Sequence, residues 1–190
     1  MIDVGTGDGR AVLAAAADPR TLAIGMDASA AAMAESSRRA AGPARKGGLP
    51  NAAFIVAAAE ASPRELCGVA DLVTVRFPWG SLLRGVLGAD DAVACGVAGL
   101  VAPSGTLELL LAPAARDGLG GLPTEPAAIV AAAVDTFGRH GFELAEGRAA
   151  TEVEVVESGS TWARRLGAGR SNGGASRVAT LVRLERPGRR

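Results

Sequence analysis

The chain has 190 residues, an apolar fraction of 48%, and equal numbers of basic and acidic side chains, 20 of each. This length is typical of one folded unit with a core of its own, so we expect a single domain over residues 1–190. The zero net charge excludes binding to nucleic acid through overall positive charge and leaves only local basic patches for that purpose.

Few residues are available for metal or nucleophilic chemistry. His140 is the only histidine, and the two cysteines, Cys67 and Cys95, are far apart. We therefore expect no metal site and no Ser-His-Asp triad. The apolar surroundings of the cysteines predict reduced thiols in the core. We expect no leader peptide and, since the sequence has no long apolar span, a soluble, cytoplasmic monomer that does not bind membranes.

The chain begins with a short strand, a glycine-rich loop at Gly5–Gly9 and a helix at Arg10–Ala17. Glycines let such a loop turn sharply and approach a ligand, and a helix start offers free N–H groups. The spacing is D-x-G-x-G-x-G and differs from the dinucleotide pattern G-x-G-x-x-G. The loop acids favour a ligand with positive centres, such as S-adenosylmethionine, over a glycine-rich turn without a ligand. The candidate cofactor-binding residues here are Asp3, Gly5, Thr6, Gly7, Asp8 and Gly9.

A second acid follows the next predicted strand, Thr21–Met26. Asp27 lies about 20 residues after the glycine loop, where an acid can accept hydrogen bonds from both ribose hydroxyls of a bound nucleoside. Alternatively, Asp27 is the N-cap of the predicted helix Ser29–Ala41.

Strands and helices alternate along the rest of the chain. Further strands are predicted at Ala53–Ala57, Asp71–Arg76, Thr106–Leu111, Phe142–Arg148 and Arg177–Leu184, and further helices at Leu82–Leu87, Asp91–Val101 and Glu125–His140. This alternation predicts a Rossmann-like α/β fold, with a mainly parallel, seven-stranded sheet and helices on both faces. The stretch Pro113–Pro123 is rich in Gly and Pro and predicts a long, mobile loop.

Ligands in such sheets bind at the carboxyl ends of the strands. The glycine loop, Asp27, Ala59-Glu60 and Pro78-Trp79 each follow the end of a predicted strand. We therefore expect them to lie along one edge of the sheet. For Glu60, the start of a short helix is an alternative role.

Four stretches together resemble one enzyme family: Asp3–Gly9, Gly47–Asn51 (G-G-L-P-N), Phe77–Gly88 (F-P-W-G-S-L-L-R-G-V-L-G) and Ser160–Leu166 (S-T-W-A-R-R-L). They are similar to the aminoglycoside-resistance 16S ribosomal RNA methyltransferases that modify N1 of adenine 1408, the kanamycin–apramycin resistance type. The resemblance covers nearly the whole chain. It implies a class I S-adenosylmethionine-dependent methyltransferase that docks on the 30S ribosomal subunit.

The resemblance also implies roles for particular residues. Asp3 and the glycine loop would hold the methionine end of the cofactor, Asp27 its ribose, and Ala59 and Glu60 its adenine. Pro78, Trp79 and Trp162 would hold the target adenine. Arg45, Lys46, Arg164, Arg165 and Arg170 would contact RNA. The family's N-terminal extension is expected to be missing here, and Asn172 stands where relatives have a basic residue.

Adenine N1 carries a lone pair and no proton, so it can attack a sulfonium methyl without a general base. The scarcity of histidine therefore does not argue against this methyltransferase activity. The enzyme has to hold a base that is turned out of its helix in line with the methyl group. There are structural alternatives to these roles. The tryptophans could belong to the core or to its edge, and the arginines could form an ordinary solvated surface. Two other functions remain open: a small-molecule methyltransferase with Pro113–Pro123 as a lid, and a relative that binds cofactor or ribosome with weak catalysis.

Overall fold

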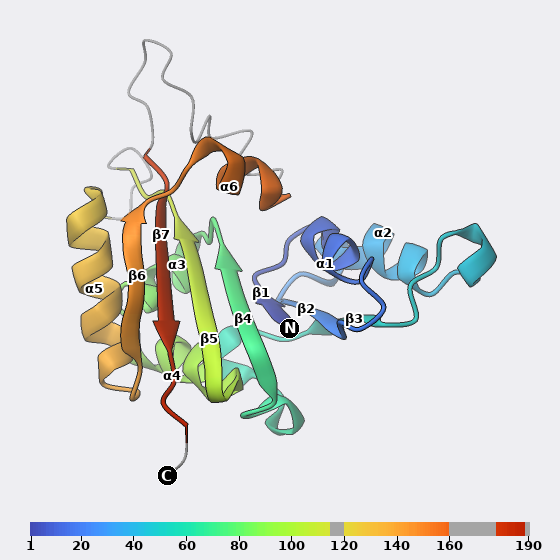
Figure 1. Ribbon diagram of the computed structural model, residues 1–190, viewed down its shortest axis with the longest axis horizontal. Coiled ribbons are helices and arrows are strands. Elements are labelled where there is room, and N and C mark those ends of the chain that lie inside the picture. The colour runs from blue at the N-terminus through green and yellow to red at the C-terminus, as the bar shows by residue number, and fades with distance from the viewer. Residues whose placement is uncertain (115–119, 160–177, 189–190) are drawn as a thin grey trace.

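The computed structural model describes residues 1–114, 120–159 and 178–188 (Figure 1). Seven strands form one sheet in the order β3-β2-β1-β4-β5-β7-β6. Strand β7 runs antiparallel to β5 and β6, whereas the pairs from β3 to β5 are parallel. The strands are β1 (Ile2–Val4), β2 (Ala23–Asp27), β3 (Ala52–Val56), β4 (Ala70–Arg76), β5 (Val101–Leu111), β6 (Glu143–Ala149) and β7 (Thr180–Glu185). The predicted fold class is confirmed.

Helices cover both faces of this sheet. They are α1 (Arg10–Ala15), α2 (Ala30–Ala40), α3 (Gly80–Val86), α4 (Asp91–Leu100), α5 (Pro126–Gly138) and α6 (Glu152–Glu157), with short 3₁₀ turns η1 (Ala44–Lys46), η2 (Ala59–Ala61) and η3 (Arg64–Leu66). Figure 1 shows α3 and α4 behind the sheet, α5 beside the β6 edge, and α6 near the carboxyl ends of β4 and β5. Within the described part of the chain, no helix has the length and apolar character needed to cross a bilayer.

Most of the apolar core lies between the sheet and α3, α4 and α5. Alternate residues of the central strands, such as Val73, Val75, Leu107 and Leu109, point into it and are fully buried. This alternation is the period of two that a strand imposes on its side chains. A smaller cluster lies on the opposite face, under α6, and contains Phe77, Leu110, Ala112, Val155, Ala179 and Leu181.

The structure differs from the expectations at several element boundaries. Strand β5 begins at Val101, five residues before the predicted start, and its pairing with β4 shifts register between Ala70 and Leu72. Residues 102–105 form an irregularity within that strand, where Ser104 has a φ of 63°. Gly105 fits because a Cβ there would lie only 2.9 Å from the Ala70 and Ala102 carbonyl oxygens.

The predicted burial of the two cysteines is wrong. Cys67 and Cys95 are both exposed free thiols. On α4 the residues that face the core are Val93, Ala94 and Val97, and the helical period turns Cys95 to the other side. Apolar neighbours in the sequence were therefore not sufficient to predict that these cysteines are buried.

Candidate active site

A cavity of about 500 Å³ opens at the carboxyl ends of β1, β2, β3 and β4. Its lining includes ten residues that the sequence singled out, namely Asp3, Gly5, Thr6, Gly7, Asp8, Asp27, Ala59, Glu60, Pro78 and Trp79. These come from four separate parts of the chain, and the parallel strands bring them to one edge of the sheet.

The glycine loop is shaped by its own backbone. The N–H groups of Gly5 and Thr6 both donate to the carbonyl oxygen of Met26, at 2.8 and 3.2 Å. Gly5, Gly7 and Gly9 have φ values of 70°, 58° and 72°, which glycine adopts readily. A Cβ on Gly7 would meet no protein atom within 4 Å, so the cavity side of this residue is open.

Gly9 is the one glycine of the loop that does not line the cavity. A Cβ at this position would lie 2.5 Å from Cε1 of Phe54 and 3.0 Å from Cβ of Ser36. Gly9 also occupies the N-cap of α1. Gly9 therefore serves the close packing of the glycine loop against Phe54 on β3 and Ser36 on α2.

Asp3 is only 3% exposed, at the base of the cavity. Its Oδ1 atom accepts a hydrogen bond from the hydroxyl of Thr74 and lies 3.3 Å from Nη1 of Arg76. A buried carboxylate requires such partners, since its desolvation is otherwise costly. The charge of Arg76 offsets that of Asp3 within the wall of the cavity.

Asp27 connects the glycine loop to the start of α2. Its Oδ2 accepts from the N–H of Gly7 at 2.9 Å, and its Oδ1 accepts from the N–H of Ser29 at 2.8 Å. The N-cap of α2 is Ser29, whose hydroxyl accepts from the N–H of Ala32, so the N-cap alternative for Asp27 is wrong. Each Asp27 oxygen retains a second lone pair for a hydroxyl of a ligand.

These features fit a nucleoside-containing cofactor with cationic centres. Asp3 and Asp27 supply two carboxylates, and Gly7 leaves room for close approach. The buried hydroxyl of Thr6 finds no hydrogen-bond partner among the described residues, which leaves it available to a ligand. Ala59 and Glu60, in turn η2, add a wall with an apolar part and a polar part. Glu60 lies in the middle of this 3₁₀ turn and does not start it, because the turn begins at Ala59.

Another part of the cavity wall is the loop that follows β4. Phe77 has a φ of 48°, donates its N–H to the carbonyl oxygen of Leu110 at 2.7 Å, and is buried. Pro78 and Trp79 then lead into α3. The indole of Trp79 is 48% exposed, which rules out a core role for it. Trp162, the expected second aromatic, lies outside the described residues.

The sequence analysis missed several cavity residues, among them three polar or loop positions. Arg76 is the last residue of β4, and Ser158 and Gly159 follow α6. For α6 a signal did exist: Thr151 and Glu154 form a capping box, and the pattern T-x-x-E marks a helix start. Nothing in the sequence indicated that the end of this helix reaches the cavity.

The two predicted RNA-binding residues that the structure describes, Arg45 and Lys46, do not line the cavity. Arg45 and Lys46 are exposed in turn η1, in the connection that leads to the amino end of β3. Arg164, Arg165, Arg170 and Asn172 lie outside the described residues. The described residues contain no group of three or more side chains that could hold a metal ion.

A family model described as NpmA, 16S rRNA (adenine(1408)-N(1))-methyltransferase, matches residues 1–180. The chain belongs to this family. A 16S rRNA (adenine(1408)-N(1))-methyltransferase from Streptoalloteichus hindustanus is 34% identical over 177 residues, which cover 90% of this chain and 81% of that protein. A relative of the same name from Streptoalloteichus tenebrarius is 36% identical over 172 residues, which cover 87% and 79%.

Solved structures of 16S rRNA (adenine(1408)-N(1))-methyltransferases share the fold. The W203A mutant from Catenulisporales acidiphilia, crystallised with the cosubstrate SAM, has a TM-score of 0.83 and is 32% identical, covering all of this chain and 86% of that one. The 16S rRNA methyltransferase KamB has a TM-score of 0.80 and is 31% identical, over 98% of this chain and 86% of that one.

Proposed function

We propose that the chain transfers a methyl group from S-adenosylmethionine to N1 of adenine 1408 in the 16S rRNA of the 30S subunit, and so confers aminoglycoside resistance. The observation that carries this proposal is a single cavity. The acidic glycine loop and the half-exposed Trp79 both line it, in a chain of this methyltransferase family.

The cofactor half of the proposal rests on the two carboxylates. Asp3 and the glycine loop would bind the amino-acid part, Asp27 the ribose hydroxyls, and Ala59 and Glu60 the adenine. Support comes from the relative that was crystallised with SAM and from the open face of Gly7. When bound, this cofactor supplies a methyl group on a positively charged sulfur.

The chain's own task is then to orient the RNA base. Adenine N1 has an in-plane lone pair and no proton, so no side chain has to act as a general base. Trp79 offers an exposed aromatic face at the cavity, and stacking a turned-out base on such a face contributes about 1–3 kcal/mol. Pro78, which is buried, fixes the backbone from which this indole projects. Trp162 would supply the second face.

The exposure of Trp79 favours an RNA substrate over a small molecule. An enzyme for a small apolar substrate encloses it in a largely apolar pocket. Here the aromatic wall is nearly half exposed, as a platform for a base attached to a large RNA requires. We further propose that Arg45, Lys46, Arg164, Arg165 and Arg170 contact rRNA phosphates, and that one methyltransferase domain acts as a monomer.

Transfer of a labelled methyl group to purified ribosomal subunits tests the proposed function. We expect incorporation into 30S and not into 50S subunits, with a reverse-transcription stop at adenine 1408, because a methyl group on N1 blocks base pairing. Cofactor binding without transfer to 30S would contradict the proposal. Transfer to a different adenine would support the proposed reaction but contradict adenine 1408 as its target.

A further inference from the structure

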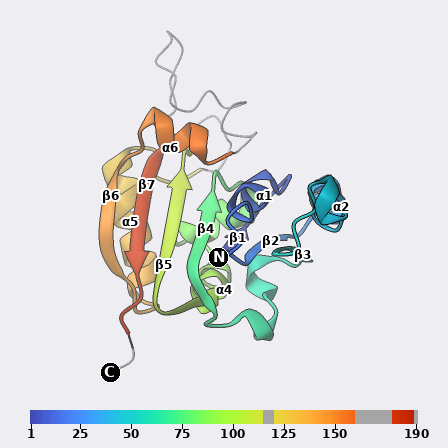
Figure 2. The ribbon, with the colours of Figure 1, turned by 45° about the vertical axis from the view of Figure 1, so that its right-hand side comes forward.

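Helix α6 forms part of the cavity although it is very short. It has six residues, and a helix of this length is not stable by itself, so contacts with its surroundings determine its position. Ser158 and Gly159, directly after it, line the cavity. A Cβ on Gly159 would lie 3.9 Å from the backbone of Ala11, so the end of α6 reaches the start of α1 (Figure 2).

An apolar contact ties α6 to the loop that carries Trp79. Val155, in the middle of the helix, is 5% exposed and belongs to the same buried cluster as Phe77. Phe77 directly precedes Pro78 and Trp79. A displacement of α6 would therefore move Ser158 in the cavity wall. It would also weaken the packing of Val155 with Phe77, next to the loop that carries Trp79.

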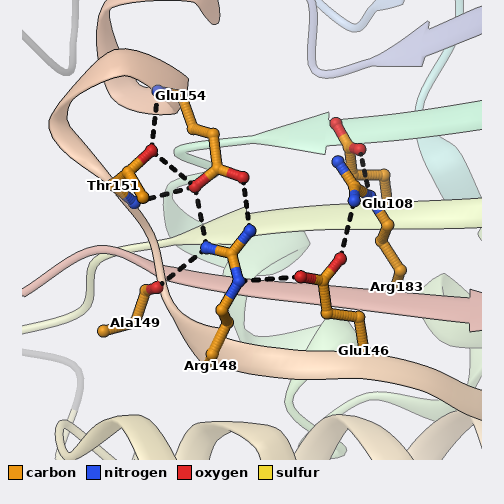
Figure 3. A network of polar contacts seen from close by, with 7 residues as sticks. All are labelled: Glu108, Glu146, Arg148, Ala149, Thr151, Glu154 and Arg183. Atoms are coloured by element: carbon orange, nitrogen blue, oxygen red, sulfur yellow. Dashed lines mark hydrogen bonds and ion pairs between the residues drawn. The ribbon is translucent and has the colours of Figure 1, made fainter.

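An ionic contact fixes the other side of α6 (Figure 3). Arg148, on β6, donates from Nη1 to Oε2 of Glu154 at 2.8 Å and from Nη2 to Oε1 at 2.6 Å. This two-point pairing restricts orientation more than a single contact does. Glu154 Oε2 also accepts from the N–H of Thr151 at 2.7 Å, which completes the capping box.

Arg148 is in turn held by a row of charges across the sheet. Its Nε donates to Oε1 of Glu146 at 2.7 Å, and Oε2 of Glu146 accepts from Nη1 of Arg183 at 2.6 Å. Arg183 donates from Nε to Oε2 of Glu108 at 2.9 Å. Strand register continues this row, one residue per strand, through Glu146, Arg183, Glu108, Thr74 and Asp3. The polar row thus extends from the base of the cavity to Arg148.

We propose that Arg148 is a positioning residue for the methyl-transfer site: by pairing with Glu154 it holds α6 where Ser158 and Gly159 complete the cavity and Val155 supports the Phe77–Trp79 loop. This inference rests on the proposed function, which it deepens. Arg148 itself does not line the cavity and acts only through α6.

The solvent exposure of the Arg148–Glu154 ion pair indicates that it positions α6 more than it stabilises the whole fold. The side chains of Arg148 and Glu154 are 38% and 24% exposed. Ion pairs with this much solvent contact contribute little to global stability. Val155 and the capping box remain when Arg148 is lost, so the helix is expected to stay folded and to occupy a wider range of positions.

The experiment compares Arg148→Met, Glu154→Gln and the double variant with a matched control, Arg139→Met. Glutamine at position 154 removes the charge but keeps the capping box, because glutamine and glutamate both cap at the third residue of a helix. Arg139, the C-cap residue of α5, pairs with Asp135 on that helix at 2.9 Å, and neither residue lines the cavity. For each variant, kcat and KM are determined in the methylation of ribosomal 30S subunits, and S-adenosylmethionine affinity is measured by calorimetry. Acrylamide quenching of Trp79 is measured in a Trp162→Phe background.

We expect Arg148→Met and Glu154→Gln each to lower kcat by about tenfold, because small displacements of a substrate wall have large effects on rate. Cofactor affinity should change by less than about threefold, since Asp3, Asp27 and the glycine loop are intact. Quenching of Trp79 should increase. The double variant should be no worse than either single variant, as expected for two residues that act as a unit.

Additive effects in the double variant, or unchanged kcat and quenching in Arg148→Met, would overturn the proposal. An equal decrease of kcat in Arg139→Met would also overturn the proposal, because it would show a general effect of removing a charge. If Arg148→Met does not fold, Glu154→Gln carries the same test. If the unaltered chain does not methylate 30S subunits, the proposed function fails, whereas the quenching of Trp79 still decides whether Arg148 positions α6.

Discussion

At the scale of single residues, Trp79 is the side chain whose role is tested most directly. Trp79→Ala should lower methyl transfer by about 10- to 100-fold, because a stack worth about 1–3 kcal/mol is lost. Cofactor affinity should stay within about threefold of the original, since both carboxylates remain. Trp79→Phe, which retains an aromatic face, is the control and should keep part of the activity. A large loss of cofactor affinity in Trp79→Ala would identify the indole as a structural support.

Gly7 and Gly9 provide a second comparison at this scale. Both have a positive φ, so alanine costs each about 1 kcal/mol in backbone strain. Gly9→Ala should lower the free energy of unfolding by about 3 kcal/mol in total, since its Cβ would overlap Phe54. Gly7→Ala should cost only the strain and instead weaken cofactor binding, because its Cβ would enter the open cavity. Denaturant unfolding and calorimetry measure the two quantities, and equal effects on both variants would contradict this division.

At the scale of elements, the pH dependence of stability tests the anchoring of α6. Hydrogen bonds from Arg148, and then from the Thr151 N–H, lower the pKa of Glu154 to about 2, from an ordinary value of 4.5. A carboxyl group whose pKa is lowered by folding stabilises the fold above its ordinary pKa, and this contribution disappears as the pH falls through the folded value. The difference in melting temperature between the original chain and Glu154→Gln should therefore be constant above pH 5 and shrink between about pH 4.5 and 2. Equal melting temperatures of the two proteins at every pH would show that Glu154 acts only through the capping box, which glutamine preserves.

Elements were predictable where one local pattern determined them, and less so where distant contacts did. The alternation of strands and helices was sufficient for the fold class, and the strand-end rule brought Asp3, Asp27 and Trp79 to one edge. The start of β5 at Val101 depends on contacts with Ala70 on the neighbouring strand, which local propensity does not contain. The place of α6 at the cavity depends on Arg148 and Val155 in the same way, through partners from other strands.

At the scale of the whole molecule, a chain with no net charge is proposed to bind a highly charged RNA. Such binding must come from local arginine and lysine contacts with phosphates, each of which makes affinity depend on salt. Arg45→Glu should weaken 30S binding by about tenfold at low salt and lower the slope of log affinity against log salt by about one. Arg139→Glu, an equal change in net charge at the C-cap of α5, should leave the slope unchanged. The same slope in both variants would remove the η1 turn from the RNA-facing surface and place the contacts elsewhere on the molecule.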